Sequence, residues 1–220
     1  MENHRNRISP THRLATVALC LISTIAVAFA AAPKWKTGTS KDGKITAIYR
    51  IGHRIDENGK RFPLIEYRAT TIDNVSMQRC IAVMKDVSNH KEFHDEEISK
   101  TVKTVSDNEW IIYYYNEGAG PFPNSDAVYR MKLSEDSSSG SAVFTLGAEP
   151  TMHEAKEAKR IRYADISYEF KDLGNDTTKV TIATKMSPPF KVPAWILKAA
   201  FPKVAFTIVR NFVTYAKEIH

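Results

Sequence analysis

The chain has 220 residues, of which 43% are hydrophobic, 25% charged and 10% aromatic, which is enough for one ordinary core and excludes a disordered or collagen-like chain. Its net charge of +6 comes from 31 basic and 25 acidic residues that are scattered along the chain rather than gathered in a stripe, so we expect no nucleic-acid partner. Two cysteines are too few for a disulfide scaffold or a multi-cysteine zinc module, and we expect no cofactor.

The first thirty residues are typical of a secretory signal peptide. Three arginines precede an uncharged run over 14–32, and Ala28-Phe29-Ala30 offers small residues for cleavage. We predict cleavage after Ala30, because a cut after residue 32 would leave a proline at the first mature position. An uncleaved membrane anchor is the alternative, since nineteen uncharged residues are nearly enough to span a bilayer. Removal of residues 1–30 takes away three arginines and one glutamate, so the exported chain, most simply periplasmic, would carry a net charge of +4.

A strand-rich domain is predicted after a linker over 31–43, which is rich in Lys, Thr, Ser and Gly. Eight segments read as strands, several of them with clean alternation of apolar and polar residues, and they are separated by turn residues such as Gly, Asn, Asp and Pro. In 127–133, for example, Tyr129 and Met131 are apolar while Arg130 between them is charged. One buried, apolar face and one solvent-exposed, polar face are typical of an antiparallel sheet. The predicted strands are 44–52, 63–72, 101–105, 109–116, 127–133, 141–146, 160–170 and 178–186.

Two helices are predicted from apolar residues at helical spacing. The first covers 75–87, and its apolar face includes Cys80, which we expect to be a buried, unreactive thiol. The second is the long amphipathic stretch 192–219, which Pro202 should kink or divide. A single large helix can cover a sheet of this size only if the sheet curves around it, and such a curved sheet leaves room for a cavity.

Three segments resemble parts of START lipid-transfer domains, which belong to the Bet v 1-like SRPBCC superfamily. Residues 116–126 (NEGAGPFPNSD) resemble the family's Pro-aromatic-Pro turn and the Ser-x-Asp-like step that ends it. Residues 160–170 followed by 180–184 resemble its succession of an Arg- and Tyr-containing strand and a Thr-x-Val strand. Residues 187–196 (SPPFKVPAWI) resemble the segment that leads into its last helix. The similarity covers about 60–218, in the right order and spacing.

The resemblance implies an α+β helix-grip fold over 44–220, in which a curved antiparallel sheet is wrapped around a long C-terminal helix and encloses a hydrophobic cavity. It also implies a binding or transfer protein that holds one lipid or sterol. We expect a monomer that touches membrane surfaces transiently. Pro189-Phe190 stands where the family has Gly-Gly, and Ser125 where it has Arg, so the ligand and the loop geometry stay open.

Candidate ligand-binding residues are apolar or aromatic side chains with one arginine among them. Arg162 is predicted on the apolar face of its strand, where it would pair with an acid or contact a ligand headgroup, unless the register shifts and exposes it. The tyrosines can each offer a hydroxyl, and packing in the core is the alternative for all the aromatic residues. The candidates are Arg162, Tyr113, Tyr115, Tyr129, Phe144, Tyr168, Phe190, Trp195, Ala199 and Phe206.

We expect no enzymatic activity and no metal site. His90 and His94 lie beside acidic residues, but the sequence lacks His-Glu-x-x-His, so this segment is interpreted as a solvated loop. The histidines sit in polar segments, and no pair of carboxylates falls on a dry strand face. Two alternatives remain, a cyclase- or hydrolase-like enzyme of the same superfamily and an interaction module without a ligand.

Overall fold

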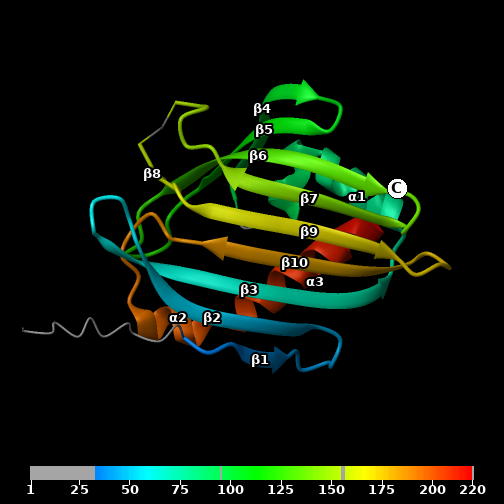
Figure 1. The fold of residues 1–220 in the computed structure, drawn as a ribbon, viewed down its shortest axis with the longest axis horizontal. Helices are drawn as coiled ribbons and strands as arrows, with labels where there is room; N and C mark the ends of the chain where they lie inside the picture. Colours follow the sequence, from blue (N-terminus) through cyan, green and yellow to red (C-terminus); the bar gives the residue numbers. More distant parts are fainter. Residues whose placement is uncertain (1–32, 95, 155–156, 220) are drawn as a thin grey trace, which may run out of the picture. The chain divides into compact units, whose positions relative to one another are not determined.

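The computed structural model describes residues 33–94, 96–154 and 157–219, so the predicted signal peptide lies outside the described residues. An antiparallel sheet forms most of the fold, with its strands in the order β1-β2-β3-β10-β9-β7-β6-β5-β4 (Figure 1). A short strand, β8, lies outside this order and pairs in parallel with β6. The strands are β1 (Lys36–Thr39), β2 (Thr46–Ile55), β3 (Arg61–Asn74), β4 (Ile98–Ser106), β5 (Glu109–Asn116), β6 (Ser125–Asp136), β7 (Ser141–Ala148), β8 (Lys159–Arg160), β9 (Ala164–Asp172) and β10 (Thr177–Met186).

Three α-helices and one 3₁₀ helix lie in the described residues. They are α1 (Met77–Lys85), η1 (Val87–Glu92), α2 (Ala194–Ala200) and α3 (Lys203–Glu218). Ser76 caps α1, because its side chain accepts a hydrogen bond from the backbone N–H of Arg79 at 3.3 Å. Pro202 separates α2 from α3, which confirms the predicted division of the C-terminal helix.

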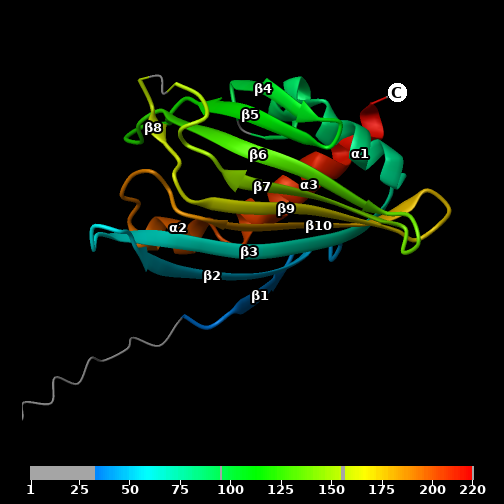
Figure 2. The ribbon, with the colours of Figure 1, turned by 45° about the horizontal axis from the view of Figure 1, so that its top comes forward.

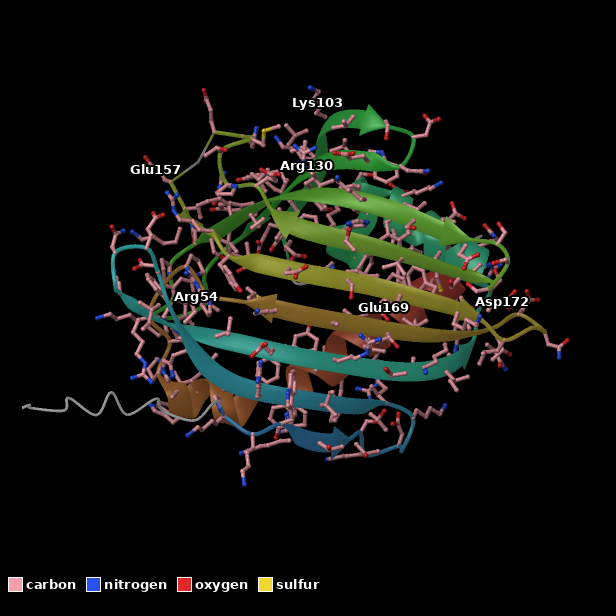
Figure 3. All side chains as sticks on the ribbon, in the orientation of Figure 1. Arg54, Lys103, Arg130, Glu157, Glu169 and Asp172 are labelled. Atoms are coloured by element: carbon pink, nitrogen blue, oxygen red, sulfur yellow. The ribbon has the colours of Figure 1, made fainter. Side chains whose placement is uncertain are left out.

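The sheet curves around α3, which packs most closely on β3, β10 and β2 (Figure 2). Helix α1 packs beside the C-terminal end of α3. This arrangement confirms the predicted helix-grip fold. The outward face of the sheet carries ion pairs between side chains of different strands, as predicted for a solvent-exposed face. Arg68 on β3, for example, reaches Glu169 on β9, and Arg130 lies on the same outward face of β6 (Figure 3).

Aromatic side chains fill much of the concave face. The rings of Phe170 and Phe212 stack nearly parallel with centroids 5.5 Å apart, and Phe144 contacts both Phe170 and Trp110 at 6.3 and 6.5 Å. Aromatic ring pairs of this kind have preferred geometries, so they favour one packed arrangement of the core side chains. On α1, Cys80 is fully buried as predicted, and burial raises the pKa of its thiol to about 12.

Two segments differ from their predictions. The segment expected to be a linker contributes β1, which pairs with β2 at the edge of the sheet. The single strand predicted over 160–170 is divided into β8 and β9, because β8 pairs with β6 whereas β9 pairs with β7 and β10. The chain must cross between these partners, so residues 161–163 leave the sheet.

Candidate functional site

A pocket of about 630 Å³ lies between one face of α3 and strands β5 and β6. Its volume falls in the range of about 300–1,000 Å³ that is usual for small-molecule sites. On α3 the lining residues recur at three- to four-residue intervals, so they form one stripe from Lys203 to Asn211 that is about 12 Å long. The pocket is lined by Phe93, His94, Glu96, Tyr114, Asn116, Ser125, Asp126, Ala127, Tyr129, Ile161, Ala200, Lys203, Val204, Thr207, Ile208 and Asn211.

The walls of the pocket are partly apolar. Val204 and Ile208 on α3 line it together with Ala127 on β6 and Ile161. Thr207, on the same stripe of α3, is exposed, so this side of the pocket is open to solvent. A ligand that lies along the stripe would therefore exchange water for aliphatic contacts over much of its length.

One end of the pocket is polar, and we call His94, Glu96, Tyr114 and Tyr129 its inner end. The ring of Phe93 lies 4.7 Å from that of His94 and 5.3 Å from that of Phe212, which follows Asn211 on α3. The inner end is therefore at the opposite end of the α3 stripe from Lys203.

His94 connects the inner end to the core. Its Nε2 atom shares a 2.7 Å hydrogen bond with the hydroxyl of Tyr168, and its Nδ1 atom lies 3.8 Å from the carboxylate of Glu96. The second distance is too long for a hydrogen bond. His94 and Glu96 come from the connection between η1 and β4, whereas Tyr168 comes from β9.

A second histidine fixes the orientation of Tyr114. His90 is fully buried, and its Nε2–H donates to the carbonyl of Met84 at 3.0 Å, because a carbonyl can only accept. In the neutral ring the Nδ1 atom then has a lone pair, so the hydroxyl of Tyr114, 2.5 Å away, donates to it. The proton of Tyr114 therefore points at His90 and its oxygen keeps its lone pairs.

Burial controls the protonation of this cluster. It lowers the pKa of His90 to about 4 and that of His94 to about 3, so both rings are neutral at pH 7. Burial also raises the pKa of Tyr114, Tyr129 and Tyr168 above the usual value, and the nearby negative charge of Glu96 adds to this effect. All three hydroxyls are therefore protonated at pH 7.

The prediction that His90 and His94 belong to a solvated loop is wrong. In the sequence, Val83, Val87, His90 and His94 are spaced by four, three and four residues, as apolar residues on one face of a helix are, although α1 ends at Lys85 and His90 lies in η1. That spacing was the sequence signal for their burial. The part of the argument against an acid or base in the cavity that placed these two histidines in polar surface segments is therefore also wrong.

Of the ten predicted site residues, Tyr129 is the one that lines the pocket. Tyr113 and Tyr115 lie on β5 but on the opposite face from Tyr114, where Tyr113 belongs to a small cluster with Ile111 and Val128. Both faces of β5 are buried, so alternation of apolar and polar residues could not tell which tyrosine faces α3.

The other apolar candidates are divided between the core and the surface. Phe144, Tyr168 and Phe206 are buried core residues, and none of them lines the pocket. Phe190 is half-buried and stacks on Phe122 with centroids 5.6 Å apart. Near the Lys203 end of the pocket, α2 places its Ala200 in the lining but exposes Ala199 and Trp195, the latter by 72%.

The prediction that Arg162 lies on the apolar face of its strand is also wrong. Arg162 precedes β9 and is exposed, because residues 161–163 have left the sheet. The buried arginine is Arg160, whose guanidinium binds both carboxylate oxygens of Asp126 at 2.7 Å. Its remaining donors reach three backbone carbonyls, those of Pro150, His153 and Glu154. This pair holds the 150–154 loop against β6.

No helix among residues 33–94, 96–154 and 157–219 is both long and apolar enough to cross a membrane. In the same part of the chain, no three His, Cys, Asp or Glu side chains come together as metal ligands would.

Solved structures of START domains are similar to this chain. A STAR-related lipid transfer protein fragment from Xanthomonas axonopodis has a TM-score of 0.68 and 20% identity, over 84% of this chain and 99% of its own. The human StarD13 (DLC2) lipid transfer and protein localization domain has a TM-score of 0.66 and 16% identity, over 85% of this chain and 91% of its own. An aromatase/cyclase from Streptomyces reaches a TM-score of 0.49 and 10% identity, over 70% of this chain and 94% of its own.

No family model matches the chain, and no curated protein matches it in sequence. At the identities above, structural likeness establishes the fold. The described chain has the START/SRPBCC helix-grip fold that its three sequence segments resemble, which confirms the expectation drawn from them.

Proposed function

We propose that this protein binds one lipid-like molecule in the pocket between α3 and strands β5 and β6. The observation that carries the proposal is a pocket of about 630 Å³ whose lining is partly aliphatic and whose inner end is polar. Similarity to proteins whose names describe lipid transfer supports it. Each methylene group buried against the aliphatic walls contributes about 0.8 kcal/mol, so roughly ten of them suffice for useful affinity.

The surface beside the Lys203 end fits a transient membrane contact. Trp195 is exposed on α2, and Lys198 is exposed one turn further along. Tryptophan favours the membrane–water interface, and lysine is attracted to anionic headgroups. A lipid that leaves or enters the pocket at this end would then pass directly between protein and bilayer.

Export is part of the proposal and rests on the sequence of residues 1–30. We propose that the protein works in the periplasm, as a monomer, after cleavage at Ala30. Fractionation of the native host followed by intact mass measurement tests this, because the mature chain should start at Ala31. A full-length mass in the membrane fraction would instead indicate an uncleaved anchor.

A pair of matched variants tests the binding site. Thr207 lines the pocket from an exposed position on α3, so Thr207→Trp should fill the pocket with little effect on folding. Thr214 is exposed on the same helix and does not line the pocket, so Thr214→Trp is the control. We expect Thr207→Trp to weaken uptake of a fluorescent fatty alcohol at least tenfold, and the control to leave it unchanged. Equal uptake by both variants would place the ligand elsewhere.

An enzyme of the cyclase or hydrolase type is the second candidate, and the observation that favours it is the position of His94 at the pocket wall. The imidazole of His94, next to the carboxylate of Glu96, can orient and polarise a bound molecule through a hydrogen bond. Incubation with ligand extracted from the host would reveal a product if the protein is an enzyme. His94→Phe should then abolish conversion while the ligand stays bound.

A further inference from the structure

A second hollow lies at the end of the sheet where β2 turns into β3. It is a groove of about 830 Å³ between that turn, the segment around β8 and residues 187–189, which follow β10. Arg54, on β2, lies in its wall near the end of β10 (Figure 3). Among the described residues, none lines both this groove and the α3 pocket, so the two are separate sites.

The guanidinium of Arg54 is held in position without a carboxylate. Its Nε–H donates to the hydroxyl of Ser187 at 2.8 Å. Its central carbon lies 4.7 Å from the centre of the Tyr163 ring and 5.2 Å from that of Phe62. Ser187 is buried, and its backbone N–H donates to the carbonyl of Tyr163 at 2.9 Å, so the partner of Arg54 is itself fixed. Within residues 33–94, 96–154 and 157–219, the N–H groups on Nη1 and Nη2 of Arg54 meet no acceptor.

Other cations share the groove with Arg54. The Nζ atom of Lys60 lies 5.2 Å from the centre of the Phe62 ring, so this one ring has two cations beside it. Lys159 and Arg162 also line the groove and are exposed. None of these four basic side chains forms an ion pair with the part of the chain that the structure describes.

The acidic residues of the groove do not offset this charge. Asp56 uses its Oδ1 atom to accept two backbone N–H groups of its own turn, at 3.0 and 2.7 Å, which keeps the carboxylate at the turn. Glu57 is exposed in the same turn. The remaining basic residue of the described lining, Arg160, is already paired with Asp126. Two acids therefore stand against four unpaired cations, and the groove keeps an excess of positive charge.

We propose that this groove binds a phosphate monoester group, with Arg54 as its principal contact. The free edge of a guanidinium can bind two phosphate oxygens at once. A phosphate monoester carries a charge of roughly −1.5 to −2 at neutral pH, and it has a further oxygen for Lys60 or Arg162. A carboxylate has a single charge and would use both of its oxygens on Arg54. Because the groove is separate from the α3 pocket, this site does not depend on the proposed lipid binding.

Two small probes test the choice of anion. Calorimetry with the full-length protein at pH 7.5 compares glycerol 3-phosphate with glycerate, a carboxylate of similar size. We expect the phosphate ester to bind about tenfold more tightly or better. Equal affinities, or tighter binding of glycerate, would overturn the assignment to phosphate.

Matched variants test the contact with Arg54. Arg54→Gln should weaken binding of the phosphate ester by about tenfold or more, and Arg54→Lys nearly as much, because lysine keeps the charge but loses the two-pronged edge. Arg61→Gln is the control, since Arg61 is exposed in the same hairpin and does not line the groove. It should stay within about twofold of the wild-type affinity. Equal losses in Arg54→Gln and Arg61→Gln would mean that net charge alone attracts the anion, and the site would be overturned.

Arg162→Gln keeps the proposal falsifiable if the Arg54 variants do not fold. The side chain of Arg162 is exposed and its loss should leave folding intact, while the affinity for glycerol 3-phosphate should fall about threefold or more. An unchanged affinity would contradict a site that draws on the cations around Arg54.

Vesicles identify the source of the phosphate. Phosphatidylcholine vesicles that contain phosphatidic acid, a lipid with a phosphate monoester headgroup, are offered to Arg54→Gln and Arg61→Gln. Weaker binding of Arg54→Gln than of Arg61→Gln would support the site and assign it to a lipid headgroup. Equal vesicle binding, with the soluble ester still discriminating between the variants, would support it and assign it to a soluble phosphate ester. If neither the ester nor the vesicles discriminate, the proposal is wrong.

Discussion

The ring of His94 shares a 2.7 Å hydrogen bond with the hydroxyl of Tyr168, a residue 74 positions further along the chain. This bond joins the segment between η1 and β4 to β9 on the other side of the core. We expect Tyr168→Phe to lower the free energy of unfolding by about 1–3 kcal/mol, because it leaves a buried ring nitrogen without its partner.

A double-mutant cycle measures this bond directly. His94→Phe and Tyr168→Phe each remove one partner, and the double variant removes both. Urea unfolding should give a double variant that is less destabilised than the sum of the two single variants by about 1 kcal/mol. Strictly additive changes would mean that the two side chains do not interact in solution.

Acid should destabilise the protein through His90. Its pKa is near 6.5 in an unfolded chain and about 4 in the folded protein, so the unfolded state takes up the proton first as the pH falls. The stability that neutral His90 contributes is fully present above pH 6.5 and is lost progressively below it. The loss levels off below about pH 4. The loss amounts to roughly 2 kcal/mol by pH 5 and about 3 kcal/mol in total.

Urea unfolding at pH 7, 6 and 5 tests this titration. The slope of the free energy of unfolding against pH should be smaller in His90→Gln than in the wild-type protein over this range. The difference in slope should correspond to the uptake of nearly one proton on unfolding. Parallel curves for the two proteins would contradict a neutral, buried His90.

Arg160 should matter far more for stability than Arg162, although only two positions separate them. Arg160→Met leaves Asp126 buried without its partner and should cost about 3–5 kcal/mol. Arg162→Met changes an exposed side chain and should stay within about 0.5 kcal/mol of the wild-type value. Urea unfolding of the two variants side by side makes the comparison. Equal effects would mean that the bidentate ion pair does not form.

The exposed tryptophan on α2 predicts how the protein meets a bilayer. Binding to phosphatidylcholine vesicles should increase when phosphatidylglycerol is added and decrease with salt, since the surface near Trp195 also carries Lys198. Trp195→Ala should weaken binding several-fold. Trp35→Ala is the control, because Trp35 is also exposed but lies beneath the guanidinium of Arg50. Equal losses in both variants would exclude a specific contact through α2.

The sequence was a good guide to the elements and the fold. A run of β-forming residues between turn residues predicts β5 to the residue, and Pro202 divides the last helix as expected. The sequence could not predict that 160–170 divides between two partners of the sheet, because pairing is decided by residues far away in the chain.

The pocket was harder to predict than the fold. Tyr113, Tyr114 and Tyr115 are equally hydrophobic, and the register of β5 against both neighbours decides which one faces α3. Arg162 and Arg160 are likewise indistinguishable in type, and their burial depends on where the chain leaves the sheet. The burial of His94 was missed because its polar neighbours hid its helical spacing from Val83, Val87 and His90.

The most direct test of lipid binding is native mass spectrometry of the exported protein, combined with extraction of any bound molecule into organic solvent. We predict one lipid per chain, released on denaturation and absent from Thr207→Trp but present in Thr214→Trp. A protein that is empty when purified, and that also takes up no member of a broad lipid panel, would contradict the assignment of the α3 pocket as a lipid site.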